Sequence, residues 1–128
     1  MSFQKTVIQS SFVAPPVGPY SQAIEAGAHV FASGQIPINS RGQIVEGSIE
    51  IQTEQVLKNL EEVFKAANVS LEQVVKTTVF LKDMNDFSKM NEVYSRFFSK
   101  HPPARSTIAV LQLPKNARIE IEAIAYKG

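Results

Sequence analysis

Residues 118–126, RIEIEAIAY, alternate apolar and polar side chains at every second position, the pattern of a β-strand with two different faces. One face carries Ile119, Ile121 and Ala123. The other face carries Glu120, Glu122, Ile124 and Tyr126. An apolar sheet face has to be buried against another layer of structure. The strand therefore requires a sheet with a second layer packed on its apolar side.

Two segments have the periodicity of amphipathic helices that can supply this layer. Residues 50–67 place apolar side chains at i, i+3 and i+4 spacing, and Ser48 is a suitable N-cap. Their apolar stripe consists of Val56, Leu57, Leu60, Val63, Phe64 and Ala67. A second helix is predicted to begin near Asp86, after an Asn85 cap, and to end at the His-Pro-Pro sequence of residues 101–103. Both helices can cover the same face of one sheet.

Segments typical of strands occupy much of the remaining chain. They are rich in β-branched and aromatic residues and are flanked by Gly, Pro or Asn. The predicted strands are residues 29–33, 74–81, 105–111 and 118–126, with two further strands at 5–8 and 42–45. The order ββ(β)αβαββ predicts an α+β fold, a mixed β-sheet of about six strands with two helices on one face. No repeat or linker divides the 128 residues, so we expect a single domain, 1–128.

The second face of the last strand predicts an oligomer. If the helices cover the isoleucine face, then Ile124 and Tyr126 lie beside two glutamates on an uncovered face. In the preceding strand, Arg105 and Thr107 lie on the opposite side from Ile108, and we expect Arg105 on the same uncovered face as the glutamates. Such a mixture of apolar and charged side chains is more typical of a subunit interface with polar pockets than of a surface in water.

The composition excludes several classes of function. A balance of 13 Lys+Arg against 12 Asp+Glu gives a net charge of +1, so we expect neither nucleic-acid nor membrane binding. The chain has no cysteine and two histidines, which excludes thiolate chemistry and predicts no metal site. No run approaches the roughly 18 apolar residues of a membrane span. Because no targeting segment is recognisable, we expect the cytoplasm, or a mitochondrion if such a segment has been removed.

Arg105 and Glu120 are the main candidates for chemistry. Arg105 opens a strand of otherwise uncharged residues after a stiff Pro-Pro-Ala segment, and its guanidinium matches a carboxylate ligand. If a short hairpin through LPKNA pairs the two strands, Glu120 lies on the same face and could orient and deprotonate water. The alternative is an internal ion pair of Arg105 with Glu120 or Glu122, which the residues alone slightly favour.

Three further elements carry polar groups or open backbone. Tyr20 follows the stiff, turning segment VAPPVGP, and its phenol can donate to a bound carboxylate or water, although such a tyrosine more often packs on its own core. In SGQIP, Ser33 precedes Gly34, where the missing side chain lets a ligand approach the backbone; a simple turn is the alternative. Asn91 in the second helix is either a ligand contact or an ordinary exposed amide.

Five ordered motifs, GPYSQA, SGQIP, VVKTTVFLKDMNDF, PPARST and LPKNARIEIEAIA, resemble the RidA-like branch of the Rid (YjgF) family, the reactive-intermediate deaminases. The resemblance extends from about residue 13 to residue 126. It implies a chorismate mutase-like fold and a homotrimer with sites in the clefts between subunits. It also implies hydrolysis of 2-iminobutanoate and 2-iminopropanoate, unstable products of pyridoxal-phosphate-dependent dehydratases, to 2-oxo acids and ammonia without metal or organic cofactor.

The resemblance further implies roles for single residues. Arg105 matches the arginine that grips the substrate carboxylate, and Glu120 matches the glutamate that positions the attacking water. The residues expected to line the same cleft are Tyr20, Ser33, Gly34 and Asn91. Thr107 stands where this branch commonly has cysteine, so its backbone can contact the ligand but any role of a thiol is lost.

Two alternative functions remain beside the deaminase. A nonenzymatic, small-ligand-binding regulatory trimer would use the same Arg105 pocket, but relatives without deaminase activity typically lack the arginine, which is present here. A ribonuclease or translation inhibitor is the other alternative. The neutral charge balance and the absence of a His/Lys catalytic cluster count against it.

Overall fold

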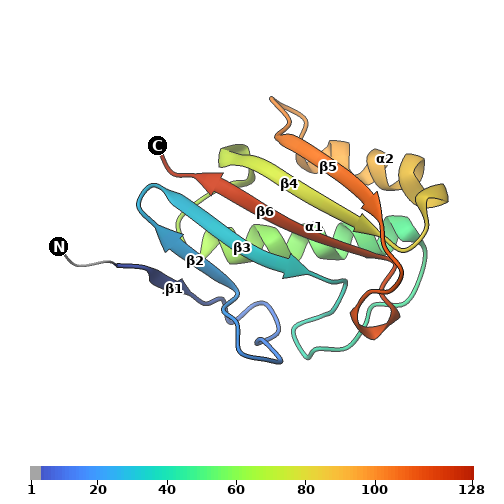
Figure 1. The fold of residues 1–128 in the computed structure, drawn as a ribbon, viewed down its shortest axis with the longest axis horizontal. Helices are drawn as coiled ribbons and strands as arrows, with labels where there is room; N and C mark the ends of the chain where they lie inside the picture. Colours follow the sequence, from blue (N-terminus) through green and yellow to red (C-terminus); the bar gives the residue numbers. More distant parts are fainter. Residues whose placement is uncertain (1–3) are drawn as a thin grey trace.

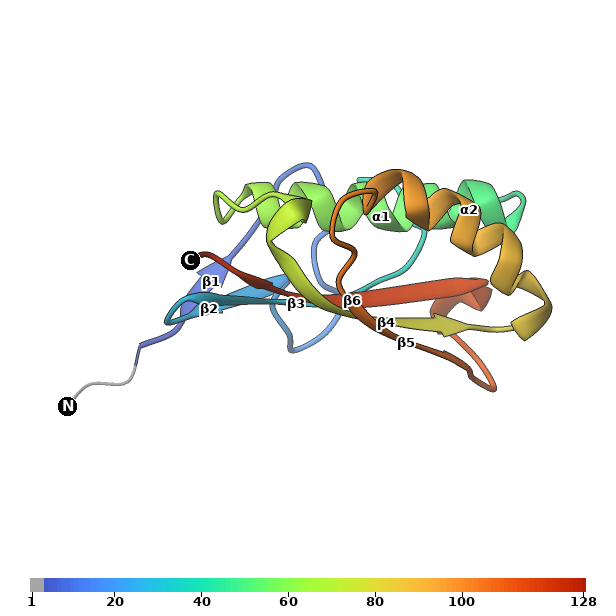
Figure 2. The same cartoon turned by 90° about the horizontal axis from the view of Figure 1, so that it is seen from above.

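The protein has two layers, a six-stranded sheet and two helices packed on one face of it (Figures 1 and 2). The computed structural model describes residues 4–128. The strands are β1 (Thr6–Ile8), β2 (Ala23–Ala26), β3 (His29–Gln35), β4 (Val74–Leu81), β5 (Ala104–Ala109) and β6 (Ile119–Tyr126). The helices are α1 (Ile49–Lys65) and α2 (Phe87–Phe97), with short 3-10 turns η1 (Leu71–Gln73), η2 (Met84–Asp86) and η3 (Pro114–Asn116). The predicted α+β class and strand number are confirmed.

The sheet order is β1-β2-β3-β6-β4-β5, which makes the alternating strand β6 a central strand. It pairs with β3 on one side and β4 on the other, antiparallel in both cases. Strand β5 lies at the edge and is parallel to β4. That parallel pair is joined through α2, because parallel neighbours need a long crossover.

The helices cover the isoleucine face of β6, as the alternation predicts. Ile119 and Ile121 are fully buried, together with Leu57, Leu60 and Phe64 of α1. Burial of each such side chain contributes roughly 1.5–3 kcal/mol. The predicted Ser48 cap is confirmed, since its hydroxyl accepts a hydrogen bond from the Ile51 amide. Figure 2 shows both helices on the same side of the sheet, with the other side left open.

Two details of the sequence prediction are wrong. Residues 42–45 do not form a strand; Ile44 makes only an isolated bridge to Ile38, and the sixth strand is β2 instead. Gly42 has a φ of 78°, a turn conformation that interrupts a strand there. The second helix begins at Phe87, near the predicted start, but its N-cap is Asp86 and not Asn85.

The open face of the sheet carries large apolar side chains beside charged ones. Phe31 is 44% exposed and Tyr126 is 48% exposed, although both lie within the sheet. Ile124 pairs with Phe31, and Glu122 pairs with Thr78 on the same face. The predicted uncovered face is therefore confirmed for Ile124 and Tyr126. None of the helices within residues 4–128 is long and apolar enough to span a membrane.

Candidate active site

Glu120 lies on the open face of β6 and extends across Gly34 of the neighbouring strand β3. A Cβ added at Gly34 would lie 2.8 Å from the Glu120 Cδ and closer still to its Oε2. Real side chains do not approach this closely, so glycine at position 34 provides the space that Glu120 fills. The β3–β6 register shifts between Ala32 and Gln35, an irregularity at the same point of the sheet. Gly34 thus acts by making room for a carboxylate.

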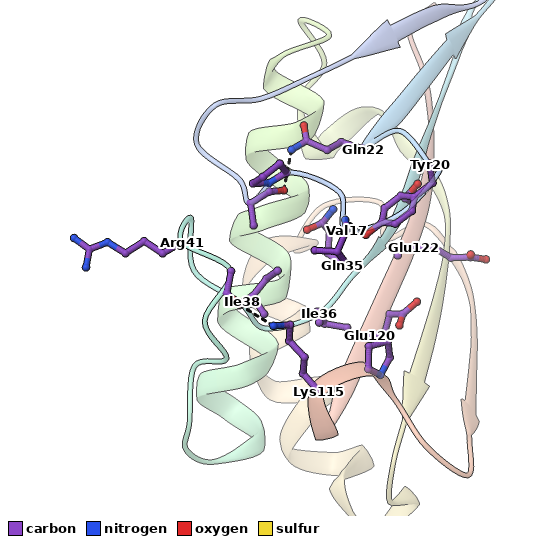
Figure 3. Close-up of a pocket in the computed structure, with 16 residues that line it drawn as sticks. Val17, Tyr20, Gln22, Gln35, Ile36, Ile38, Arg41, Lys115, Glu120 and Glu122 are labelled. Atoms are coloured by element: carbon purple, nitrogen blue, oxygen red, sulfur yellow. Dashed lines mark hydrogen bonds between the residues drawn. The ribbon is translucent and has the colours of Figure 1, made fainter.

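The Glu120 side chain lines a cavity of about 690 Å³ on this face. The cavity also contains the predicted residues Tyr20, Ser33 and Gly34. Ser33 donates a 2.6 Å hydrogen bond to the carbonyl of Ser21, which fixes the segment that carries Tyr20. Figure 3 shows Tyr20 and Glu120 on one side of the cavity, whereas Arg41 points away from it. The structure therefore brings four of the predicted site residues together.

The remaining walls of this cavity were missed by the sequence reasoning. They come from Val17, Ile36 and Ile38, and from η3 through Pro114 and Lys115. The motifs SGQIP and LPKNA contain several of these residues, but nothing in their spacing shows that they face the same space. The cavity forms only when the segment after β3 and the turn before β6 come together beside Glu120.

The Glu120 carboxyl has a pKa above its ordinary value of 4.5. Burial is the main cause, because a carboxylate loses hydration there, and the like charge of Glu122 adds to it. Within residues 4–128, no lysine or arginine forms an ion pair with Glu120. A carboxyl group whose pKa is raised toward neutrality is a better proton acceptor and donor at physiological pH.

Arg105 lies on the other face of the sheet, against α2. Its guanidinium carbon is 4.8 Å from the ring centre of Tyr94 and 5.5 Å from that of Phe87. None of the ion pairs in the described part of the chain includes Arg105. The expected internal ion pair with Glu120 or Glu122 is therefore not formed. Arg105 is held by aromatic ring faces and has no anion beside it.

Asn91 and Thr107 belong to the same side as Arg105. Asn91 follows Phe87 by four residues on α2, and Thr107 follows Arg105 by two on β5. The Oδ1 atom of Asn91 and the Oγ1 atom of Thr107 are buried without a hydrogen-bond partner in the described chain. Buried polar atoms normally have partners. These two atoms therefore mark a place where a ligand or a second chain can complete the contacts.

The expectation that Arg105 and Glu120 share one face is wrong. The segment LPKNA does not close a hairpin, because β4 lies between β5 and β6. Arg105 is in register with Thr77, which is in register with Ala123. Glu120 is an odd number of positions from Ala123, so its side chain points to the opposite face. The predicted site residues thus form two sets, one on each side of the sheet.

No metal site is evident in the part of the chain that the structure describes. Residues 4–128 contain no group of three or more His, Asp or Glu side chains that could hold an ion.

Comparisons with known proteins identify the family. The family model for endoribonuclease L-PSP matches residues 12–127. A RutC family protein of Pyrococcus horikoshii is 55% identical over 124 residues, covering 96% of this chain and 98% of that protein. The 2-iminobutanoate/2-iminopropanoate deaminase of Homo sapiens is 44% identical over 128 residues, covering 99% of this chain and 93% of that protein. A crystal structure from Thermotoga maritima matches with a TM-score of 0.95 and 50% identity, covering 98% of this chain and 99% of that chain. The chain belongs to the endoribonuclease L-PSP family, the Rid (YjgF) family that its motifs resemble.

Proposed function

We propose that this protein is a 2-iminobutanoate/2-iminopropanoate deaminase that works as a homotrimer with its sites between subunits. The name of the human relative, at 44% identity, supports the activity. The observation that carries the proposal is the separation of two unpaired charges, Glu120 in a cavity on one face and Arg105 on the other. A single subunit cannot bring these two groups to one substrate.

The open sheet face supports the proposed assembly. Phe31, Ile108 and Tyr126 are each more than two-fifths exposed there. Large apolar residues gathered on one face are typical of a surface that another chain covers. If the β5–α2 edge of a neighbouring subunit packs beside the Glu120 cavity, each charge meets the partner that it lacks. In a cyclic trimer this contact repeats around the ring, so every interface forms one site.

The substrate fits such a divided site because its two reactive features lie on adjacent carbons. A 2-imino acid has a carboxylate next to an electrophilic C=N carbon. Arg105 of one subunit binds the carboxylate with its planar guanidinium. Glu120 of the neighbour holds a water near the imine carbon and accepts a proton as the water adds. Tyr20 lines the Glu120 cavity, and Asn91 and Thr107 supply polar contacts beside Arg105.

The same glutamate can finish the reaction. The substrate reacts as the protonated imine, so addition of water with loss of one proton to Glu120 gives a neutral carbinolamine with a hydroxyl and an amino group on one carbon. The proton held by Glu120 then passes to the nitrogen, the C–N bond breaks, and ammonia leaves as the C=O bond of the 2-oxo acid forms. The Glu120 carboxylate accepts the hydroxyl proton and releases it to the departing ammonia. The raised pKa of Glu120 suits both proton transfers. Because these imines also hydrolyse unaided, positioning contacts suffice for the modest barrier reduction.

The family description names a second candidate, an endoribonuclease. The net charge of +1 provides no field that attracts a phosphate backbone, so we rank this activity below the deaminase. A nonenzymatic ligand binder would use the same Arg105 pocket but would not require Glu120 for function.

The deaminase proposal is tested by coupling the protein to a purified threonine dehydratase. The rate of 2-oxobutanoate formation is followed while semicarbazide competes for the imine. We expect the wild-type protein to divert imine from semicarbazide and Arg105→Ala to lose this effect, because the carboxylate is no longer bound. Equal behaviour of the two proteins refutes the site. RNA cleavage that disappears on further purification, or that survives Arg105→Ala unchanged, counts against the ribonuclease.

A further inference from the structure

The two aromatic rings beside Arg105 differ in how firmly they are held. Phe87, at the first residue of α2, is 36% exposed, whereas Tyr94 is 5% exposed. The Tyr94 ring is also the nearer of the two to the guanidinium, at 4.8 Å against 5.5 Å. Tyr94 is therefore the fixed surface on which the Arg105 side chain rests.

Two contacts hold the Tyr94 ring in place. Its hydroxyl is 2.7 Å from the hydroxyl of Thr77 on β4, a residue with no exposed surface. The ring of Phe98 packs at a centroid distance of 4.7 Å. Thr77 is the residue on β4 that pairs with Arg105 on β5. The buried hydroxyl pair thus anchors the ring directly beside the strand position that carries the guanidinium.

We propose that Tyr94 is a positioning residue for Arg105, which orients the guanidinium toward the substrate carboxylate before the substrate arrives. The inference rests on the proposed function of Arg105. A cation over an aromatic ring is attracted to the ring face, and this leaves the in-plane N–H groups free to donate. An arginine side chain has a large rotamer entropy when it is free, so a guanidinium that is already ordered loses less on binding.

The electrostatics of Tyr94 agree with this role. Burial is the largest influence and raises the pKa of the phenol, while the Thr77 hydrogen bond, the Arg105 charge and hydrogen bonding with Arg105 act in the opposite direction. The raised pKa keeps Tyr94 neutral at physiological pH, so it does not form an ion pair that competes with the substrate for Arg105. The ring offers an attractive surface without neutralising the guanidinium.

The test compares Tyr94→Leu with Tyr94→Phe in the assembled protein. Tyr94→Leu removes the ring face, and we expect the KM for 2-iminobutanoate and the Kd for 2-oxobutanoate to rise about 3- to 30-fold. We expect kcat to stay within about twofold, because Glu120 and the water are untouched.

Tyr94→Phe retains the ring, and its KM and Kd should change less than about threefold. Phe12→Leu is the control, because Phe12 is 74% exposed and is neither packed on Tyr94 nor one of the rings over Arg105; its Kd should match wild type.

A second pair of variants keeps the test decisive if Tyr94→Leu does not fold. Thr77→Val removes the partner of the Tyr94 hydroxyl, and Thr77→Ser restores a hydroxyl. We expect Thr77→Val to weaken 2-oxobutanoate binding about two- to fivefold, with kcat unchanged, and Thr77→Ser to recover the wild-type Kd. Wild-type affinity in Tyr94→Leu, or in Thr77→Val if the first variant is unfolded, overturns the inference.

Calorimetric titration with 2-oxobutanoate separates failure of the inference from failure of the proposed function. If wild type binds 2-oxobutanoate but does not hydrolyse imines, the deaminase proposal fails and the effect on Kd still tests Tyr94. If wild type hydrolyses imines and Tyr94→Leu binds 2-oxobutanoate normally, only the inference fails. If wild type neither binds nor hydrolyses, the proposed role of Arg105 is refuted and the inference falls with it.

Discussion

Glu120 on the open face of the sheet and Arg105 on the helical face lie in different surroundings. On the open face, Glu120 lies half-buried in a cavity, where burial and the like charge of Glu122 both raise its pKa. On the helical face, Arg105 rests on Tyr94 and Phe87 with no anion beside it. A folded chain normally pairs such charges internally, because an unpaired buried charge is costly. We therefore propose that each face is one half of a site that a second subunit completes.

The largest expected effect is at Glu120, because the acid–base step depends on it. We predict that Glu120→Gln lowers the catalysed rate by about 10²- to 10⁴-fold. Binding of 2-oxobutanoate should stay near the wild-type value, because Arg105 is intact. Rates come from the dehydratase-coupled assay and affinities from calorimetry. Loss of affinity or of the oligomer in this variant means that Glu120 is structural.

The second largest effect is expected when the Glu120 carboxyl group is displaced on the open face. Gly34→Ala introduces a Cβ into space that the Glu120 carboxyl group occupies, so the carboxyl group must move. We predict a fall in kcat of at least about tenfold, since a displaced base no longer aligns the water. Gly18→Ala is the control, because its Cβ would meet only the Tyr20 ring at an ordinary 3.6 Å. Equal activity of both variants shows that the position of Glu120 is not critical.

The smallest predicted effect is a shift in the Glu120 titration that depends on Arg105 of a neighbouring subunit. Burial and Glu122 raise the pKa of Glu120, so the catalysed rate should fall as pH drops through this raised value and the carboxylate becomes protonated. In the proposed assembly, the guanidinium of a neighbouring subunit would favour the carboxylate and lower this pKa. We therefore predict that Arg105→Ala shifts the Glu120 titration to higher pH, as measured by carboxyl carbon NMR. An unchanged titration indicates that the two groups do not meet.

Local periodicity predicted the layers of this fold well. The i, i+3, i+4 stripe ending at Phe64 and Ala67 and the alternation of Ile119 and Ile121 each depend on neighbouring residues, and both faces lie where expected. Strand β2 was missed because its sequence, AIEA, has little β propensity. It forms a strand by pairing with β3 across a turn at Gly27, whose φ is 59°.

The site was harder to predict because strand pairing is a long-range property. The motifs of the family selected Arg105 and Glu120, but the sequence alone did not show that β4 lies between their strands. One intervening strand and an odd register offset place the two side chains on opposite faces. The aromatic support of Arg105 was also missed, since Tyr94 and Phe87 belong to an ordinary amphipathic stripe of α2.

Mixing two inactive variants tests the divided site most directly. Arg105→Ala and Glu120→Gln subunits are unfolded, mixed in equal amounts and refolded together. A mixed trimer contains one interface where an intact Glu120 meets an intact Arg105, so about a quarter of all sites should regain activity on random assembly. The control replaces Glu120→Gln by the Arg105→Ala/Glu120→Gln double variant, which cannot supply an arginine. Recovery of about a quarter of wild-type deaminase activity in the first mixture alone is the predicted result. No recovery, with mixed trimers verified by mass spectrometry, would contradict a site shared between subunits.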